Sequence, residues 1–268
     1  MVPPFIELTN LTKNFGNGKG IFDLSFGVQQ GEVFGFLGPN GAGKSTTIRH
    51  LMGFVKPQSG SCQIMGKDCF SQAALIQQSV GYLAGEIAFI EDMSGISYLN
   101  FIADMKGIRD RSSIRDLLYR FELNPRGKIK KMSKGMKQKI GLVAAFMGDP
   151  SVLILDEPTS GLDPLMQNRF VELLLERKKK GSTVFMSSHI FEEVEKTCNR
   201  TAIIREGRLV DIVQMKELSK LRNRIYTVTL HDKESAQRLA AVEQLDIINV
   251  CGRKVQIRVK KELPNTLR

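Results

Sequence analysis

A glycine-rich stretch that joins an expected strand to an expected helix constrains this chain more than any other feature. Residues 32–37, EVFGFL, have the continuous apolar character of a buried strand, and residues 44–54 carry apolar side chains at helical spacing. The joining residues match the pattern G-x-x-x-x-G-K-[ST] and are Gly38, Pro39, Asn40, Gly41, Ala42, Gly43, Lys44, Ser45 and Thr46. Glycines allow successive backbone N–H groups to point at phosphate oxygens, and the following helix directs its positive dipole end to the same place. The stretch therefore predicts a phosphate-binding loop (P-loop).

Two consecutive acids complete the expected nucleotide site. Residues 152–155, VLIL, are typical of a strand buried on both faces, and Asp156 and Glu157 follow it directly. We expect Lys44 to reach the β- and γ-phosphates, while the Ser45 hydroxyl and Asp156 hold Mg²⁺. Glu157 lies beyond the strand, where a carboxylate can orient and polarise the attacking water. The two motifs together predict a P-loop nucleoside triphosphatase.

Strands and helices alternate through most of the chain. Beyond the P-loop, the pattern predicts a buried strand over 183–187 and helices over 134–146, 165–180 and 191–197. This alternation predicts an α/β fold with a mostly parallel sheet and helices on both faces. The short apolar runs in residues 5–37 predict an N-terminal antiparallel β subdomain.

Two further segments have a different pattern from this core. A helical subdomain is expected at about 86–140, with Ser112 as the N-cap of one helix. After Val213, two runs alternate like half-exposed strands around an expected helix, and a hairpin turn is expected at 251–254. We therefore expect a nucleotide-binding domain over 1–214 and a small α+β appendage over 215–268. The chain ends just after its third expected strand, which leaves open whether the appendage is truncated.

Three further motifs follow in an order that resembles one family. Residues 155–164, LDEPTSGLDP, resemble the joined Walker B motif and D-loop of ATP-binding cassette (ABC) ATPases. Ser187-Ser188-His189 follows the next strand, as the switch histidine of that family does, and 132–138, MSKGMKQ, takes the place of the signature LSGGQ. The resemblance covers about residues 3–213. It implies the nucleotide-binding subunit of a bacterial ABC transporter.

The resemblance also implies how the site is completed. Two such domains pack head to tail, and each ATP lies between the P-loop of one subunit and the signature of the other. His189 would contact the γ-phosphate and help to hold Glu157 and the water in line, and Phe15 would stack on the adenine. The signature residues facing the partner's ATP are Ser133, Lys134, Gly135 and Met136, and the D-loop residues are Ser160, Gly161, Leu162 and Asp163.

The chain departs from the family pattern at a few positions. In the signature, Lys134 replaces a glycine and Met136 replaces a glutamine. The family usually has a glutamine where this chain has Gly85, so either the following Glu86 substitutes as a Mg²⁺ ligand or Mg²⁺ uses water there. Phe15 replaces the commoner tyrosine. We expect these changes to affect the catalytic rate more than nucleotide binding. The same changes resemble the pattern of a subgroup of bacterial ATPase subunits that serve exporters with separately encoded membrane subunits.

Composition indicates whether such a subunit is folded, whether it spans a membrane and in which cellular compartment it works. The hydrophobic fraction of 42% and charged fraction of 25% exclude disorder for the bulk of the chain. No apolar stretch approaches the ~18 residues that a membrane span needs. The four cysteines are scattered without a C-x-x-C pair, which favours reduced thiols in the cytoplasm. We therefore expect a cytoplasmic subunit, peripheral on the inner face of the membrane, that uses ATP and Mg²⁺ to power a separate permease, with export favoured.

Other functions and partners stay open at this point. The formal charge of +11 would also suit a soluble ABC ATPase acting on nucleic acid or ribosomes. Such proteins carry tandem cassettes or a long insertion, whereas only 89 residues separate Lys44 from Ser133, so no nucleic-acid partner is expected. The altered signature also suits a regulator with low turnover. A homodimer is favoured over a pairing with a related subunit. The basic stretch 126–139 is either a solvated face or a surface near phosphates and anionic lipid.

Overall fold

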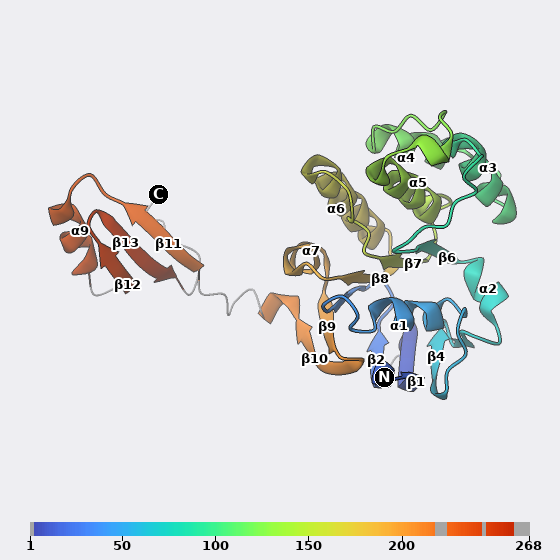
Figure 1. The fold of residues 1–268 in the computed structure, drawn as a ribbon, viewed down its shortest axis with the longest axis horizontal. Coiled ribbons are helices and arrows are strands. Elements are labelled where there is room, and N and C mark those ends of the chain that lie inside the picture. Colours follow the sequence, from blue (N-terminus) through green and yellow to red (C-terminus); the bar gives the residue numbers. More distant parts are fainter. Residues whose placement is uncertain (1–2, 218–223, 243–244, 260–268) are drawn as a thin grey trace. The chain divides into compact units, whose positions relative to one another are not determined.

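The computed structural model describes residues 3–217, 224–242 and 245–259 of the chain (Figure 1). The chain divides into two compact units, Met1–Val213 and Gln214–Arg268. The first unit contains two sheets and the second contains one, and each unit has its own buried core. The assignment of 1–214 and 215–268 as separate domains stays a prediction.

The centre of the first unit is a six-stranded sheet with the order β10-β9-β3-β8-β7-β6. Its strands are β3 (Val33–Leu37), β6 (Val80–Leu83), β7 (Val152–Asp156), β8 (Thr183–Ser188), β9 (Arg200–Arg205) and β10 (Arg208–Gln214). β3 pairs in parallel with β8 and β9, and β7 pairs in parallel with β6 and β8. Every residue of β7 and β8 is buried, as continuous apolar runs predict. The mostly parallel sheet is confirmed, and the carboxyl ends of β3, β7 and β8 therefore meet at one edge.

A four-stranded sheet covers one face of the central sheet together with α1. Its order is β2-β1-β4-β5. The pairs β1–β2, β1–β4 and β4–β5 are antiparallel, as the sequence predicted. These elements are β1 (Ile6–Gly16), β2 (Lys19–Val28), α1 (Lys44–Leu51), β4 (Ser59–Ile64) and β5 (Lys67–Asp68). Phe26 of β2 stacks on Phe34 of β3 at 5.3 Å and lies 6.1 Å from Phe185 of β8. This aromatic cluster joins the two sheets into one core.

The remaining helices of the first unit follow the sequence signals closely. They are α2 (Ala73–Gln77), α3 (Gly95–Met105), α4 (Ser112–Arg120), α5 (Lys134–Phe146), α6 (Pro164–Lys179) and α7 (Phe191–Thr197), with a 3₁₀ turn at Ile129–Lys131. The side chains of Ser94, Ser133 and Asp163 cap α3, α5 and α6 by accepting backbone N–H bonds.

The predicted N-cap at Ser112 is wrong. α4 begins at Ser112 itself, and Arg111 occupies the cap position without a side-chain cap. The carboxylate of Asp110 accepts from both the Ser112 backbone N–H at 2.8 Å and the Ser112 hydroxyl at 2.7 Å. Ser112 thus lies one position past the cap, and its hydroxyl donates to this upstream acid instead of accepting an N–H of the helix.

The second unit is a small α+β fold, as expected. Its elements are β11 (Arg224–Thr229), α9 (Lys233–Ala240), β12 (Asp246–Cys251) and β13 (Lys254–Val259), and the antiparallel sheet has the order β11-β13-β12. Gly252, with a φ of 61°, makes the two-residue hairpin between β12 and β13, which confirms the predicted turn. Ala236, Val255 and Ile257 form its buried core.

A partly buried ion pair between β9 and the segment before β3 predicts a large effect on stability. Arg200 Nε and Nη2 lie 2.7 and 3.0 Å from the Glu32 carboxylate, and Nη2 also donates to the Gly27 carbonyl at 2.7 Å. Glu32 is only 8% exposed. We expect Arg200→Met to lower the free energy of unfolding by about 3 kcal/mol, because it leaves a buried carboxylate unpaired. Urea unfolding of the full chain measures this change.

A matched control lies at the other end of the same strand. Arg205 pairs with Glu206 at 3.6 Å, and both side chains are largely exposed. Arg205→Met should change the free energy of unfolding by less than about 0.5 kcal/mol. Equal losses in the two variants would contradict a special contribution from the Arg200–Glu32 pair.

Candidate ATP site

The P-loop, residues 38–46, connects β3 to α1. At two of its positions the backbone adopts a conformation that favours glycine. Gly41 and Gly43 have φ angles of 79° and 107°, in the left-handed region. A side chain on Gly43 would also meet Ile21 at 2.8 Å, and one on Gly38 would lie 2.4 Å from the carbonyl oxygen of Ile204. The glycines therefore leave the backbone of the loop without side chains directly before the N-terminus of α1, where an anion is favoured.

Lys44 lies across this loop and points to the end of β7. Its side chain is 6% exposed, and Nζ donates to the carbonyl oxygens of Gly38 at 2.7 Å and Pro39 at 3.2 Å. Nζ also forms an ion pair with Glu157 Oε1 at 3.1 Å, outside hydrogen-bond geometry. The hydroxyl-bearing side chain of Ser45, the next residue, is exposed. The ammonium group is thus held at the loop by contacts that phosphate oxygens can replace.

The two acids at the end of β7 have different surroundings. Asp156 is 4% exposed, and its Oδ1 accepts from the Ser187 hydroxyl at 2.5 Å. The same hydroxyl accepts from the backbone N–H of Glu157 at 3.0 Å. Glu157 has a φ of 50°, an uncommon angle for a glutamate, and its Oε2 lies 2.6 Å from His189 Nδ1. The Glu157 carboxylate therefore lies between the ammonium of Lys44 and the imidazole of His189.

This arrangement supports two kinds of chemistry. A half-buried carboxylate beside an imidazole can accept a proton from a water molecule. A buried carboxylate and a nearby hydroxyl are the oxygen donors that Mg²⁺ prefers, together with phosphate oxygens and waters. Among the described residues, no cluster of three or more His, Cys, Asp or Glu side chains is positioned to hold a metal by itself. Burial and the charge of Asp156 raise the pKa of Tyr82, so this neighbouring phenol stays neutral.

The signature and the D-loop contact each other within the chain. Ser133 is exposed, and its hydroxyl accepts from the Met136 N–H at 3.2 Å as the N-cap of α5. A side chain on Gly135 would lie 2.8 Å from the carbonyl oxygen of Gly161, and the methylenes of Lys134 pack over the α-carbon of Gly161. Asp163, at the end of the D-loop, caps α6. The D-loop turn is therefore placed directly against the start of α5.

Two predicted residues make no direct contact with the acids or the P-loop lysine. Phe15 is 57% exposed at the end of β1, with Lys13 Nζ 6.0 Å from the ring centre. Glu86 is exposed and has no ion pair or hydrogen bond from its carboxylate to another described residue. Gly85 is closer to the acids, because a side chain there would lie 3.1 Å from Asp156 Oδ2.

The structure adds residues to which the sequence analysis gave no role. Gln138 is 5% exposed on α5, and its Nε2 donates to the carbonyl oxygens of Glu157 at 3.3 Å and Pro158 at 2.9 Å. Ser187 holds both acids of the Walker B motif. A polar residue in an expected helix, Gln138, and one in an expected buried strand, Ser187, were the signals available in the sequence. Buried polar side chains need hydrogen-bond partners, so each could have been predicted to bond to a neighbouring segment.

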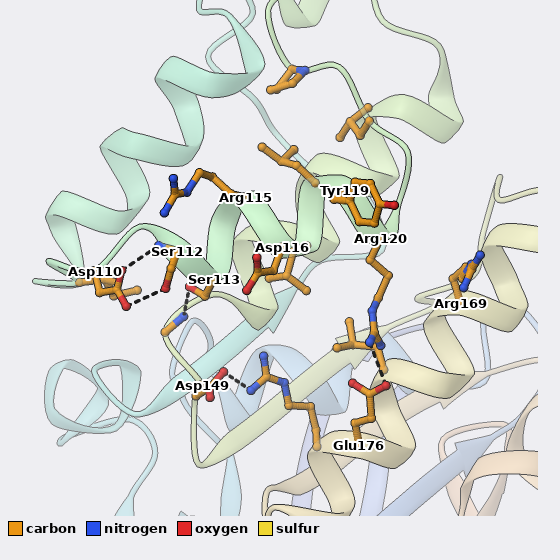
Figure 2. A pocket seen from close by; sticks show the side chains of 18 of the residues that line it. Asp110, Ser112, Ser113, Arg115, Asp116, Tyr119, Arg120, Asp149, Arg169 and Glu176 are labelled. Atoms are coloured by element: carbon orange, nitrogen blue, oxygen red, sulfur yellow. Dashed lines mark hydrogen bonds and ion pairs between the residues drawn. The ribbon is translucent and has the colours of Figure 1, made fainter.

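A cleft of about 1510 Å³ lies apart from these residues, between α4 and α6 (Figure 2). Some of its charged side chains pair with one another: Arg120 donates to Glu176 at 2.8 Å, and Arg177 pairs with Asp149. None of the residues predicted for the nucleotide site lines this cleft. We therefore give it no part in nucleotide binding.

Comparison with known proteins identifies the family. The family model for ABC transporters matches residues 21–160, from β2 through the P-loop, the signature, the Walker B acids and the first residue of the D-loop. The chain belongs to the ABC transporter family. The predicted resemblance is thereby confirmed: the protein is the nucleotide-binding subunit of a bacterial ABC transporter, and it is an ATP hydrolase.

Three relatives of the ABC transporter family illustrate the similarity. The bacitracin transport ATP-binding protein BcrA of Bacillus licheniformis is 36% identical over 86% of this chain and 76% of its own length. The ABC transporter ATP-binding protein YhcH of Bacillus subtilis is 36% identical over 96% of this chain and 84% of its own. The linearmycin resistance ATP-binding protein LnrL of the same organism is 36% identical over 77% of this chain and 68% of its own.

Solved ABC structures have the same fold. An ATP-binding subunit of an ABC transporter superposes with a TM-score of 0.73 at 29% identity, covering 81% of this chain and 92% of its own. The dimeric bacterial cassette MJ0796 superposes with a TM-score of 0.71 at 20% identity, covering 78% of this chain and 98% of its own. Within the described residues, no helix is long and apolar enough to cross a membrane.

Proposed function

We propose that this ABC subunit hydrolyses ATP to move substrate through a separate membrane permease, in the direction of export. The position of the Glu157 carboxylate, between Lys44 and His189 at the mouth of the P-loop, carries the proposal. The names of two relatives, a bacitracin transport protein and a linearmycin resistance protein, favour the removal of toxic compounds from the cell.

The hydrolytic step follows from the contacts of these three residues. ATP would draw Lys44 Nζ from the carbonyl oxygens of its own loop and from Glu157 to the β- and γ-phosphates. Glu157, released from this ion pair, would then take the proton of the attacking water. His189 lies 2.6 Å from the far oxygen of the same carboxylate, where it would orient Glu157 and contact the γ-phosphate. Nucleotide binding and activation of the base are thus linked through one lysine.

The residues present also fit Mg²⁺. Ser187 bonds to Oδ1 of Asp156, while Oδ2 lies on the side of Gly85, and the exposed Ser45 side chain follows Lys44 on the P-loop. A bound Mg²⁺ would offset the charge of the phosphates there. We propose Ser45 and Asp156 as its protein ligands. We propose that water takes the place of the family's glutamine, because the Glu86 side chain is exposed and no described residue holds its carboxylate toward the site.

We further propose that the ATP sandwich forms between two copies of this chain. The N-terminus of α5 carries an exposed Ser133 hydroxyl and the Gly135 N–H, both suited to a γ-phosphate from another subunit. Lys134 adds a positive charge beside them, and Met136 completes the turn. The D-loop would face the partner from the same side, since Gly161 packs on Gly135. Phe15, exposed on β1, would stack on the adenine.

Docking on a permease would place the subunit on the inner face of the membrane, in the cytoplasm. Exposed large apolar side chains mark surfaces that other proteins cover. Between β3 and α4, the exposed ones are Phe54, Phe70, Leu75, Ile90, Phe101 and Met105. We propose that the permease contacts this region.

The dimer is tested by light scattering on purified Glu157→Gln protein. Because this variant does not hydrolyse bound ATP, the closed dimer should persist, and Mg-ATP should shift the molar mass from monomer to dimer. Adding Ser133→Arg should abolish the shift, since a bulky cation would replace the hydroxyl that contacts the partner's γ-phosphate. ATP binding measured separately on the same samples should remain.

Mg-ADP serves as the control, because it fills the P-loop without supplying a γ-phosphate. It should leave Glu157→Gln protein monomeric. If Mg-ATP binds and the protein stays a monomer, self-pairing is wrong. Closure would then require the permease or a different second subunit.

A further inference from the structure

The end of β8 and the following His189 form two links to the end of β7 and one link to α7. Ser187 bonds to Asp156 at 2.5 Å, and His189 lies 2.6 Å from Glu157. Ser188, between them, donates its hydroxyl to Glu193 Oε2 at 2.6 Å. The first two links involve residues already placed in the ATP site. The third leads to an acid on α7 that has no part in the proposed hydrolysis.

Glu193 joins two segments through its two oxygens. Oε1 accepts from the hydroxyl of Thr159, directly before the D-loop, while Oε2 accepts from Ser188, directly before His189. The side chain is half-buried in the first turn of α7, and its backbone carbonyl accepts from Thr197 at 2.7 Å. Within the part of the chain that the structure describes, Glu193 forms no ion pair with a basic side chain. The Glu193 carboxylate therefore accepts hydrogen bonds from the hydroxyls of Thr159 and Ser188.

Each partner of Glu193 is rigidly connected to a functional segment. The Ser160 N–H donates to the Glu157 carbonyl at 3.1 Å, and the Leu162 N–H donates to the Thr159 carbonyl at 3.0 Å. Thr159 therefore moves together with the D-loop turn. On the other side, the Ser188 carbonyl accepts from the Gly38 N–H of the P-loop at 3.2 Å.

We propose that Glu193 is a positioning residue that holds the D-loop and His189 at a fixed separation. A partner subunit that presses on the D-loop would then also set His189 against Glu157, so that hydrolysis responds to dimer closure. The proposal rests on the proposed function, in which the D-loop faces the partner. Charge-assisted bonds from hydroxyls to a half-buried carboxylate are strong enough to transmit such a displacement.

Steady-state ATP hydrolysis by the full chain tests this role. Glu193→Ala should lower kcat about thirtyfold, because a misplacement of about 1 Å in a catalytic group costs up to about a hundredfold. The KM for ATP and the affinity for a fluorescent ADP should stay within about threefold, since no P-loop contact is lost. Glu193→Gln should keep at least a third of wild-type kcat, because an amide can accept from one hydroxyl and donate to the other.

Glu192→Ala is the matched control. It removes an exposed acid from the same turn of α7, where both acids favour the helix N-terminus, and should leave kcat within about twofold of wild type. If Glu192→Ala loses as much as Glu193→Ala, or if Glu193→Gln falls as low as Glu193→Ala, the positioning role is wrong. Wild-type kcat and KM in Glu193→Ala would also overturn it.

Hydrogen exchange separates this proposal from the proposed function. In the chain without nucleotide, Glu193→Ala should speed amide exchange in residues 159–163 and in 188–190 together, while the P-loop keeps its protection. Faster exchange in one of the two segments alone would overturn the link. This readout applies even if the wild-type chain fails to dimerise with ATP, which would contradict only the proposed self-pairing.

Discussion

Glu157→Gln is expected to lower the ATP turnover of this chain about a thousandfold, within the range for loss of a general base. The amide keeps the size of the side chain but cannot accept a proton from water at neutral pH. The affinity for ADP should rise about threefold, because Lys44 is no longer held by an ion pair at 3.1 Å that bound phosphate must break. Phosphate release measures the first effect and calorimetry with ADP measures the second.

Glu206→Gln is a matched control for this variant. Glu206 also has a φ in the left-handed region, at 51°, but it is exposed and pairs with the equally exposed Arg205. Turnover should stay within about twofold of wild type, as expected for an exposed pair. A Glu157→Gln protein that retains a tenth of wild-type turnover would rule out Glu157 as the base.

Lys44→Ala should weaken ADP binding about a hundredfold, equivalent to about 3 kcal/mol. The ammonium is almost fully buried, and its bonds to the carbonyls of Gly38 and Pro39 would be replaced by charge-assisted bonds to phosphate oxygens. The substitution also leaves Glu157 without its cation. Calorimetry with ADP measures the affinity without interference from hydrolysis.

Lys106→Ala separates a loss of binding from a general effect of removing a lysine with a partly buried ammonium group. The Lys106 ammonium donates to the Val80 carbonyl at 2.9 Å, and burial lowers its pKa. Both substitutions are expected to reduce stability, whereas only Lys44→Ala should reduce ADP affinity. Similar losses of affinity in the two variants would contradict a direct contact between Lys44 and phosphate.

Features that depend on neighbours in the sequence could be predicted well. The helix over 134–146 and the hairpin at 251–254 occur where the pattern places them. α4 shows the limit of such signals, because the helix begins at Ser112 itself, whose N–H and hydroxyl both donate to the upstream Asp110. A shift of one residue at a helix start depends on such local bonds, which composition does not specify.

Most contacts between distant segments could not be predicted, although the family resemblance implied that His189 acts on Glu157. Nothing in the sequence indicates that Glu157 adopts a left-handed backbone, which turns its carboxylate toward Lys44 on one side and His189 on the other. The closeness of Gly135 to Gly161 likewise follows from packing of α5 against the D-loop. The motif order indicated that these groups belong to one site but not which atoms meet.

The sequence by itself determined the phosphate-binding loop, the alternation of buried strands and amphipathic helices, and the family to which the chain belongs. These are local properties, because glycine spacing and hydrophobic period act within a few residues. The tertiary structure alone decided that Lys44 pairs with Glu157 and that Glu193 joins Thr159 to Ser188. Parallel pairing of β3, β8 and β7 places their carboxyl ends at one edge, so residues more than thirty positions apart come within bonding distance.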